Sequence, residues 1–298
     1  IRKCEVMLSA KQGNQERVLE NDNAMKRIPT GVSDLDSIIK GGLPAGSVVL
    51  LLGDVGAGQQ EFAYTAMAKL AIVKNNPNAV EFYLGTGQKE AKLPQNFLYI
   101  TFSRSREDIL NEILLSFNKD YHDAVRDNVV FKDFSQEYFK HTIVPTQWTS
   151  SAPSIFSAGQ EEPLLPSLIN QLTESADHAV VVIDSLTDLV VSETIKTHEL
   201  VLAVKGLQRA AKQWKGIIYL LLATDILPKS KEQTFIDSVD GVFKFEWSKS
   251  MKSSRRQRYL YIEKFLSLLP HLEENRLVRF ITSVSSQEGF VVLDRVQI

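Results

Sequence analysis

One glycine-rich segment of the chain carries the strongest signal for a ligand-binding site. Its spacing matches the phosphate-binding loop G-x-x-x-x-G-K-S/T, whose glycines let backbone N–H groups and a helix N-terminus face a phosphate. Gln59 stands at the position of the lysine, and Gln60 stands at the position of the hydroxyl that binds magnesium. The sequence therefore predicts a phosphate cradle that has lost both chemical side chains. The segment consists of Gly53, Asp54, Val55, Gly56, Ala57, Gly58, Gln59 and Gln60.

Alternating apolar runs and helical stretches must hold this loop in place. Continuous apolar runs suit strands that are buried on both faces of a parallel sheet. Helices are expected at 62–70, after a capping motif formed by Ser105 and Asp108, and over a long amphipathic stretch that includes 200–214. This alternation predicts βαβ crossovers and a sheet flanked by helices. The expected strands are 47–52, 97–102, 129–131, 179–183 and 217–223.

The pattern changes elsewhere in the chain. Ser33 and Asp36 have capping-box spacing, which predicts a short helix that stops at 41–42. Residues 141–166 hold four prolines among serines and threonines, which predicts a long surface loop. After about residue 240, short alternating segments predict antiparallel hairpins at the edge of the sheet. Those segments are 242–247, 259–263, 277–282 and 289–293.

Composition narrows the class of protein. With 34 Lys and Arg against 36 Asp and Glu, the net charge of −2 rules out a globally basic nucleic-acid binder. The single cysteine, Cys4, excludes an intrachain disulfide and a cysteine-based zinc site. The apolar runs are too short to cross a bilayer, and the N-terminus lacks the apolar region of a signal peptide. We therefore expect a cytoplasmic protein without a membrane partner. We expect 1–26 to be an N-terminal extension or leader, and 27–298 to form one domain.

Four segments carry a resemblance to a known family. Residues 28–36 and 41–46, the acidic strand 180–186 and the segment 258–264 look like the KaiC-like branch of the RecA superfamily, over roughly 27–293. The chain is most similar to the degenerate, inactivated archaeal group that is also labelled HTR-like. The resemblance implies a RecA-like fold, that is, a mostly parallel twisted sheet flanked by helices with antiparallel C-terminal hairpins.

The resemblance also implies roles for particular residues. Asp184 corresponds to the Walker B aspartate, although a capping carboxylate at a strand end is the alternative interpretation. Lys264 corresponds to a residue that reaches a neighbouring subunit's nucleotide, but Leu266 and Ser267 replace the arginine and glycine that follow it in relatives. Ser103 and Arg104 stand where active relatives have two glutamates, one of which activates water. A carboxylate base is therefore missing.

The expected losses in binding energy and in reaction rate favour a protein that does not hydrolyse nucleotide. A charge-assisted hydrogen bond contributes roughly 1.5–3 kcal/mol, so loss of the lysine weakens nucleotide binding about 10- to 150-fold. A missing general base costs about 10²–10⁴ in rate. We expect no catalytic residues, no metal site, weak binding of ATP or ADP with Mg²⁺ doubtful, and a regulatory or scaffolding role of the signal-transduction type. The expected partners are further copies of the chain and an unknown protein.

Two other functions stay open at this point. A residual ATP-dependent enzyme would use an unorthodox residue such as Glu61. A nucleic-acid-binding RecA paralogue would use basic residues between 249 and 258, including Arg255 and Arg256, although a solvated charged turn explains those residues as well. Gln59 and Gln60 are likewise either solvated loop residues or side chains that contact phosphate or fill the emptied site. The five histidines show no metal-ligand spacing.

Overall fold

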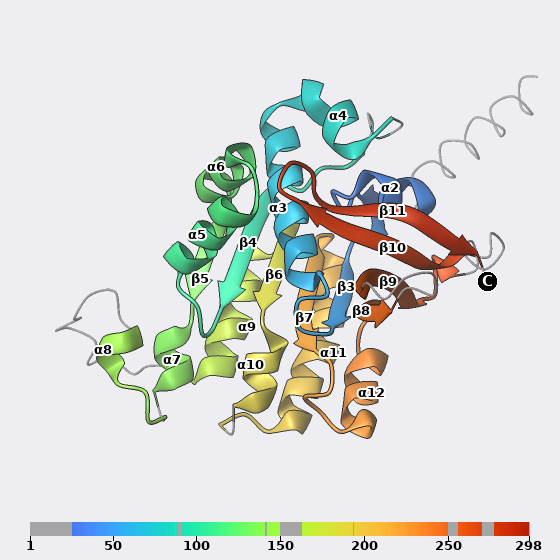
Figure 1. Ribbon diagram of the computed structural model, residues 1–298. Helices are drawn as coiled ribbons and strands as arrows, with labels where there is room; N and C mark the ends of the chain where they lie inside the picture. Colours follow the sequence, from blue (N-terminus) through green and yellow to red (C-terminus); the bar gives the residue numbers. More distant parts are fainter. Residues whose placement is uncertain are drawn as a thin grey trace, which may run out of the picture.

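A nine-stranded sheet organises the part of the chain that is described in the computed structural model (Figure 1). The described residues are 26–86, 88, 91–140, 142–149, 163–192, 194–249, 256–269 and 277–297, so the expected extension at 1–26 lies outside them except for Lys26. From edge to edge the strands are β11 (Gly289–Gln297), β10 (Leu277–Ser285), β9 (Arg256–Phe265), β8 (Gly241–Lys249), β3 (Ser47–Gly53), β7 (Ile217–Ala223), β6 (Ala179–Asp184), β4 (Asn96–Thr101) and β5 (Val130–Asp133).

The direction of the strands divides this sheet into two parts. The six strands from β8 to β5 pair in parallel, whereas β9, β10 and β11 pair antiparallel beyond β8. The predicted parallel sheet with antiparallel C-terminal strands is confirmed. A separate two-stranded ribbon joins β1 (Arg27–Ile28) to β2 (Leu43–Pro44).

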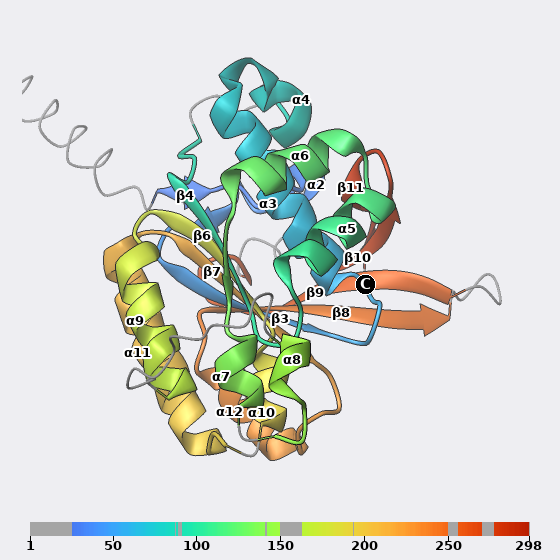
Figure 2. The same cartoon turned by 90° about the vertical axis from the view of Figure 1, so that its left-hand side faces the viewer.

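Helices cover both faces of the sheet because neighbouring strand residues point to opposite sides. Along β3, Val49 and Leu51 pack into one core cluster, and Val48 and Leu50 pack into the other. Figure 2 shows the two helical layers on either side of the strands. The first layer holds α2 (Ser33–Ile38), α3 (Gln59–Asn75), α4 (Val80–Leu84) with the short η1 (Pro77–Ala79), α5 (Arg106–Ser116) and α6 (Lys119–Asn128). The second holds α9 (Leu164–Ser175), α10 (Leu186–Val191), α11 (Thr197–Trp214) and α12 (Lys229–Asp237).

The structure corrects two local expectations. Ser33 begins α2, but the residue before it, Val32, is the N-cap, and no side chain caps the helix. Asp36 is instead fully buried and accepts hydrogen bonds from the N–H groups of Thr30 at 2.8 Å and Gly31 at 3.2 Å. The expected loop at 141–166 contains the short helix α8 (Thr146–Thr149) and the start of α9, after α7 (Ser135–Phe139); residues 150–162 lie outside the described part. By contrast, the predicted Ser105–Asp108 capping box is confirmed at α5.

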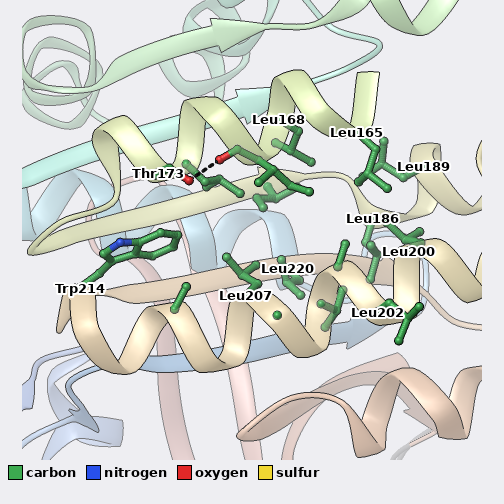
Figure 3. Close-up of a pocket in the computed structure, with 17 residues that line it drawn as sticks. Leu165, Leu168, Thr173, Leu186, Leu189, Leu200, Leu202, Leu207, Trp214 and Leu220 are labelled. Atoms are coloured by element: carbon green, nitrogen blue, oxygen red, sulfur yellow. Dashed lines mark hydrogen bonds between the residues drawn. The ribbon is translucent and has the colours of Figure 1, made fainter. Parts of the chain in front are cut away.

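An apolar groove of about 390 Å³ lies between α9 and α11, in the second helical layer (Figure 3). Leu168 and Leu172 line it from α9, and Leu207 and Trp214 line it from α11. The groove is on the opposite face of the sheet from α3, the helix that follows the glycine-rich loop. Among the described helices, none has the length and apolar character needed to cross a membrane.

Candidate phosphate-binding loop

The loop from Gly53 to Gly58 joins the carboxyl end of β3 to the N-terminus of α3. This is the edge of a parallel sheet where ligands of α/β proteins bind. The backbone turns through positive φ angles of 74° at Gly56 and 120° at Gly58. A Cβ at Gly58 would lie 2.9 Å from the ring of Phe290, so both the dihedral angle and the packing require glycine there.

The loop keeps backbone donors free. Within the described part of the chain, no hydrogen bond engages the N–H groups of Val55, Gly56, Gly58, Gln59 or Gln60. The last two belong to the first turn of a 17-residue helix, where N–H groups have no partner in the helix and the dipole favours an anion. The predicted cradle therefore has the donors that a phosphate needs.

One flank of the loop, formed by β7, β8 and β9, holds its main chain in shape. The carboxylate of Asp54 accepts from the Thr224 hydroxyl at 2.8 Å and from the Trp247 N–H at 3.1 Å. The indole Nε1 of Trp247 donates to the Val55 carbonyl at 3.3 Å, and Arg258 Nε donates to the Gly56 carbonyl at 3.1 Å. Arg258 also stacks over the Trp247 ring, 4.5 Å from its centroid. This basic residue lies on β9 and braces the loop, so it does not belong to a solvated turn.

Gln59 does not replace the missing lysine in function. Its side chain turns back toward the loop, where Nε2 lies 3.5 Å from the Gly53 carbonyl. Its Oε1 is buried and accepts no hydrogen bond from any described residue. An uncharged amide in this position supplies no charge to a phosphate, so the interpretation that Gln59 packs against the emptied loop is the one that the geometry favours.

Gln60 turns the other way, toward the acidic end of β6. Its Nε2 donates to the hydroxyl of Tyr64 at 2.9 Å and to Oδ2 of Asp184 at 3.2 Å. Asp184 is the last residue of β6 and is 8% exposed. The same Oδ2 accepts from the Tyr99 hydroxyl at 2.6 Å. The amide and the phenol thus contact the same oxygen of the Asp184 carboxylate.

Burial sets the protonation of this cluster. It raises the pKa of Asp184, while the Tyr99 hydrogen bond and the nearby Arg104 charge oppose that rise. Burial and the Asp184 charge together raise the pKa of Tyr99 well above its ordinary value. Tyr99 therefore stays a hydrogen-bond donor at every physiological pH.

Arg104 brings a positive charge into the site. The Thr101 hydroxyl donates to the Arg104 carbonyl at 2.9 Å, which fixes the turn after β4. From this turn the guanidinium reaches the Tyr64 hydroxyl at 3.1 Å and forms an ion pair with Glu112 of α5. Its Nη1 lies 3.8 Å from Oδ2 of Asp184. Burial alone would lower the pKa of Arg104, but Tyr64 and Glu112 raise it, so the charge is permanent.

Sequence reasoning identified Asp184, Gln59 and Gln60 but missed three members of this network. Tyr64 lies one helical turn after Gln60, a spacing that places side chains together. Tyr99 pairs in register with Val182, two residues before Asp184, so its strand position was also available. Glu112 gave no signal, because it faces the site only through the packing of α5.

The residues present do not fit the Mg²⁺ ion that the resemblance implies. Gln60 offers an amide where a hydroxyl would bind the ion, and its amide nitrogen donates to the carboxylate of Asp184. That carboxylate also has a phenol and a guanidinium close to it. Among the described residues, no group of three His, Cys, Asp or Glu side chains could hold a metal ion.

Lys264 lies at the other end of the sheet from the loop, near the C-terminal end of β9. Its ammonium donates to three carbonyls at the end of α12 and just beyond, those of Ile236, Asp237 and Val239, at 2.8–2.9 Å. An ammonium has three donors, so all of them act within the chain. Contact with a neighbouring subunit stays a prediction, and it would require these bonds to break.

Comparison with known proteins agrees with this fold. No protein-family model matches the chain, and no curated protein matches it. Among solved structures, a KaiC-like protein from the hyperthermophilic archaeon Pyrococcus horikoshii is similar, with 16% sequence identity and a TM-score of 0.57. The match covers 91% of this chain and 100% of that one. The described part of the chain therefore has the KaiC-like, RecA-type α/β fold that its sequence resembles.

Proposed function

We propose that the protein is a pseudo-ATPase, a regulatory or scaffolding protein that binds ATP or ADP weakly and does not hydrolyse ATP. The observation that carries the proposal is the contrast within the loop. Five of its N–H groups, from Val55, Gly56, Gly58, Gln59 and Gln60, make no hydrogen bond to a described residue, while the side chains around it contact one another. Binding would thus depend on main-chain donors and the α3 dipole, without the lysine that supplies charge in ordinary phosphate loops.

The absence of hydrolysis follows from the residues after β4. Ser103 is neutral, and the Arg104 guanidinium is a permanent cation, so neither residue can take a proton from water. Loss of a general base costs about 10²–10⁴ in rate, and a poorly held metal adds to this cost. The missing base alone would lower a typical turnover of about 1–10³ per second to about 10⁻⁴–10 per second, and a poorly held metal would lower it further.

Calorimetry and a phosphate-release assay test the two halves of the proposal. We expect ATP and ADP to bind with dissociation constants in the micromolar to millimolar range, with no phosphate release above that of a protein-free control. A matched variant, Gly56→Asp, places a carboxylate at the cradle, at a position where an added Cβ would have its nearest neighbour 4.0 Å away, and should weaken binding of an anion. Absence of binding up to millimolar nucleotide would contradict the cradle, and steady release of phosphate would contradict the pseudo-ATPase.

A second experiment separates a repurposed fold from a decayed enzyme. The double substitution Gln59→Lys with Gln60→Thr restores the two side chains of the phosphate-loop motif. We expect tighter nucleotide binding, because a charge-assisted hydrogen bond contributes roughly 1.5–3 kcal/mol. We expect no hydrolysis, because no base is restored. Hydrolysis by this variant would favour the alternative in which a residue such as Glu61 still acts on water.

A further inference from the structure

The cluster around Asp184 contains a fixed cation in the region where the resemblance implies a metal ion. Arg104 Nη1 lies 3.8 Å from Asp184 Oδ2, and Arg104 Nη2 is paired with Glu112. A divalent cation would compete with this guanidinium for the same two carboxylates. The Thr101 hydroxyl hydrogen-bonds to the main chain of Arg104 and so holds this residue at the end of β4. The positive charge at this position is therefore supplied by the protein itself and not by a bound ion.

The Arg104 guanidinium also has N–H groups that make no hydrogen bond to a described residue. A guanidinium carries five N–H donors, of which hydrogen bonds to described residues use one toward Tyr64 and one toward Glu112. The Arg104 side chain is 29% exposed, so the remaining donors can meet an incoming group. Arginine matches phosphate oxygens with two parallel hydrogen bonds, which a compact metal ion or a lysine does not provide.

We propose that the Arg104 guanidinium takes the place of the divalent cation, so that the protein binds the polyphosphate of a nucleotide in its metal-free form. The inference rests on the proposed nucleotide binding and specifies the chemical form of the ligand. Mg²⁺ neutralises part of the polyphosphate charge, and that charge is what Arg104 and the N-terminus of α3 attract. Mg²⁺ therefore weakens binding here, the reverse of its effect in enzymes that hold the ion.

Calorimetry with ATP in excess EDTA and in excess MgCl₂ tests the inference. We expect tighter binding in EDTA. Arg104→Ala should weaken binding in EDTA about 10-fold or more, the loss expected for a charge-assisted hydrogen bond. Arg104→Lys keeps the charge without the paired donors, so its affinity for ATP in EDTA should lie between those of wild type and Arg104→Ala. Arg106→Ala, which removes an exposed arginine that donates to the Arg126 carbonyl, is the matched control and should bind as wild type does.

The outcomes separate this inference from the proposed function. Binding that is tighter in EDTA and is lost in Arg104→Ala supports both. Binding that requires Mg²⁺ overturns the role of Arg104 and leaves nucleotide binding intact. No binding in either buffer overturns the proposed binding, and the inference falls with it. Circular dichroism melts of each variant show whether it is folded, and a folded Arg104→Ala that binds ATP as tightly as wild type overturns the inference.

A direct titration of Mn²⁺, followed by electron paramagnetic resonance, provides a readout without nucleotide. We expect wild type to bind no Mn²⁺ at this site, because Arg104 is already paired with Glu112 beside Asp184. Arg104→Glu replaces the cation with a third carboxylate and should bind Mn²⁺. Binding by wild type that Asp184→Asn abolishes would overturn the inference.

Discussion

The two flanks of the phosphate loop differ in what they contact. On the side of β7, β8 and β9, Thr224, Trp247 and Arg258 bond to Asp54 and to loop carbonyls. On the side of β4 and β6, the side chains hydrogen-bond to one another, because Gln60 and Tyr99 both donate to the carboxylate of Asp184. The first flank holds the main chain of the loop in shape, and the second is a network of side chains that contact one another.

This difference shows that the shape of a phosphate loop and its chemistry can be separated. The shape depends on glycines, on bonds to carbonyls and on the strand and helix that the loop joins, so it needs no ligand. The chemistry depends on a few side chains whose exchange leaves the fold intact. Because the hydrogen bonds from Trp247 and Arg258 engage carbonyl groups, the N–H groups of Val55 and Gly56 keep no partner among the described residues and can donate to an anion.

The largest effect is expected from an addition to the loop itself. Gly58→Ala forces a Cβ to within 2.9 Å of Phe290 at a φ of 120° and should lower the free energy of unfolding by about 4 kcal/mol. Gly56→Ala is the matched control: its nearest neighbour is 4.0 Å away, so strain alone should cost about 1 kcal/mol. Urea unfolding measures both. Equal losses would show that packing against Phe290 does not restrict the loop.

A substitution in the second flank should have the next largest effect. Asp184→Ala leaves the Tyr99 hydroxyl, the Gln60 amide and the Arg104 charge without their acceptor, and should cost about 3 kcal/mol in urea unfolding. Asp184→Asn keeps an oxygen that can accept from Tyr99 and should cost about 1 kcal/mol. If the two variants unfold at the same urea concentration, the cluster does not stabilise the fold as we infer.

A smaller, local effect is expected in the first flank. Trp247→Phe removes the indole N–H that donates to the Val55 carbonyl but keeps an aromatic ring beneath Arg258. Val55 is 87% exposed, so water can replace the lost bond, and global stability should fall by about 0.5 kcal/mol. Hydrogen exchange of the Ala57 N–H, which is bonded to the Asp54 carbonyl, should become faster. Unchanged exchange would show that this bond does not restrain the loop.

The sequence predicted most of the fold and about half of the site, for identifiable physical reasons. Continuous apolar runs such as 47–52 are typical of buried strands of a parallel sheet, and the Ser105–Asp108 capping motif marks the start of a helix. These signals are local. Asp36 was assigned to a cap because its spacing does not show that it points inward to Thr30 and Gly31.

The site was predicted where it follows the chain and missed where it depends on packing. The loop was recognised because its three glycines, Gly53, Gly56 and Gly58, lie within six residues of the sequence. The Arg104 position was identified only as a lost glutamate, because its contact with Asp184 joins the turn after β4 to the end of β6. The role of Arg258 was also hidden, since its hydrogen bond to Gly56 joins residues that are 202 positions apart in the sequence.

The smallest effect is expected at Glu61, whose pKa is affected by one charge from each flank, those of Arg258 and Glu112. Burial raises its pKa above the ordinary value of 4.5, the Arg258 charge lowers it, and the Glu112 charge raises it. A raised pKa in the folded state means that this group's contribution to stability falls as the pH rises from about 4.5 through the folded pKa. Glu61→Gln should remove that part of the pH dependence.

Carboxyl-carbon NMR titration of Glu61 shows which flank controls it. Arg258→Met removes the charge that lowers the pKa, so the Glu61 pKa should rise above that of wild type and stability should fall further with pH. Glu112→Gln removes a charge that raises the pKa, so the Glu61 pKa should fall below that of wild type. The order should be Arg258→Met, wild type, Glu112→Gln. If both variants titrate as wild type does, the two flanks are not coupled through Glu61, and each can change without an electrostatic effect on the other.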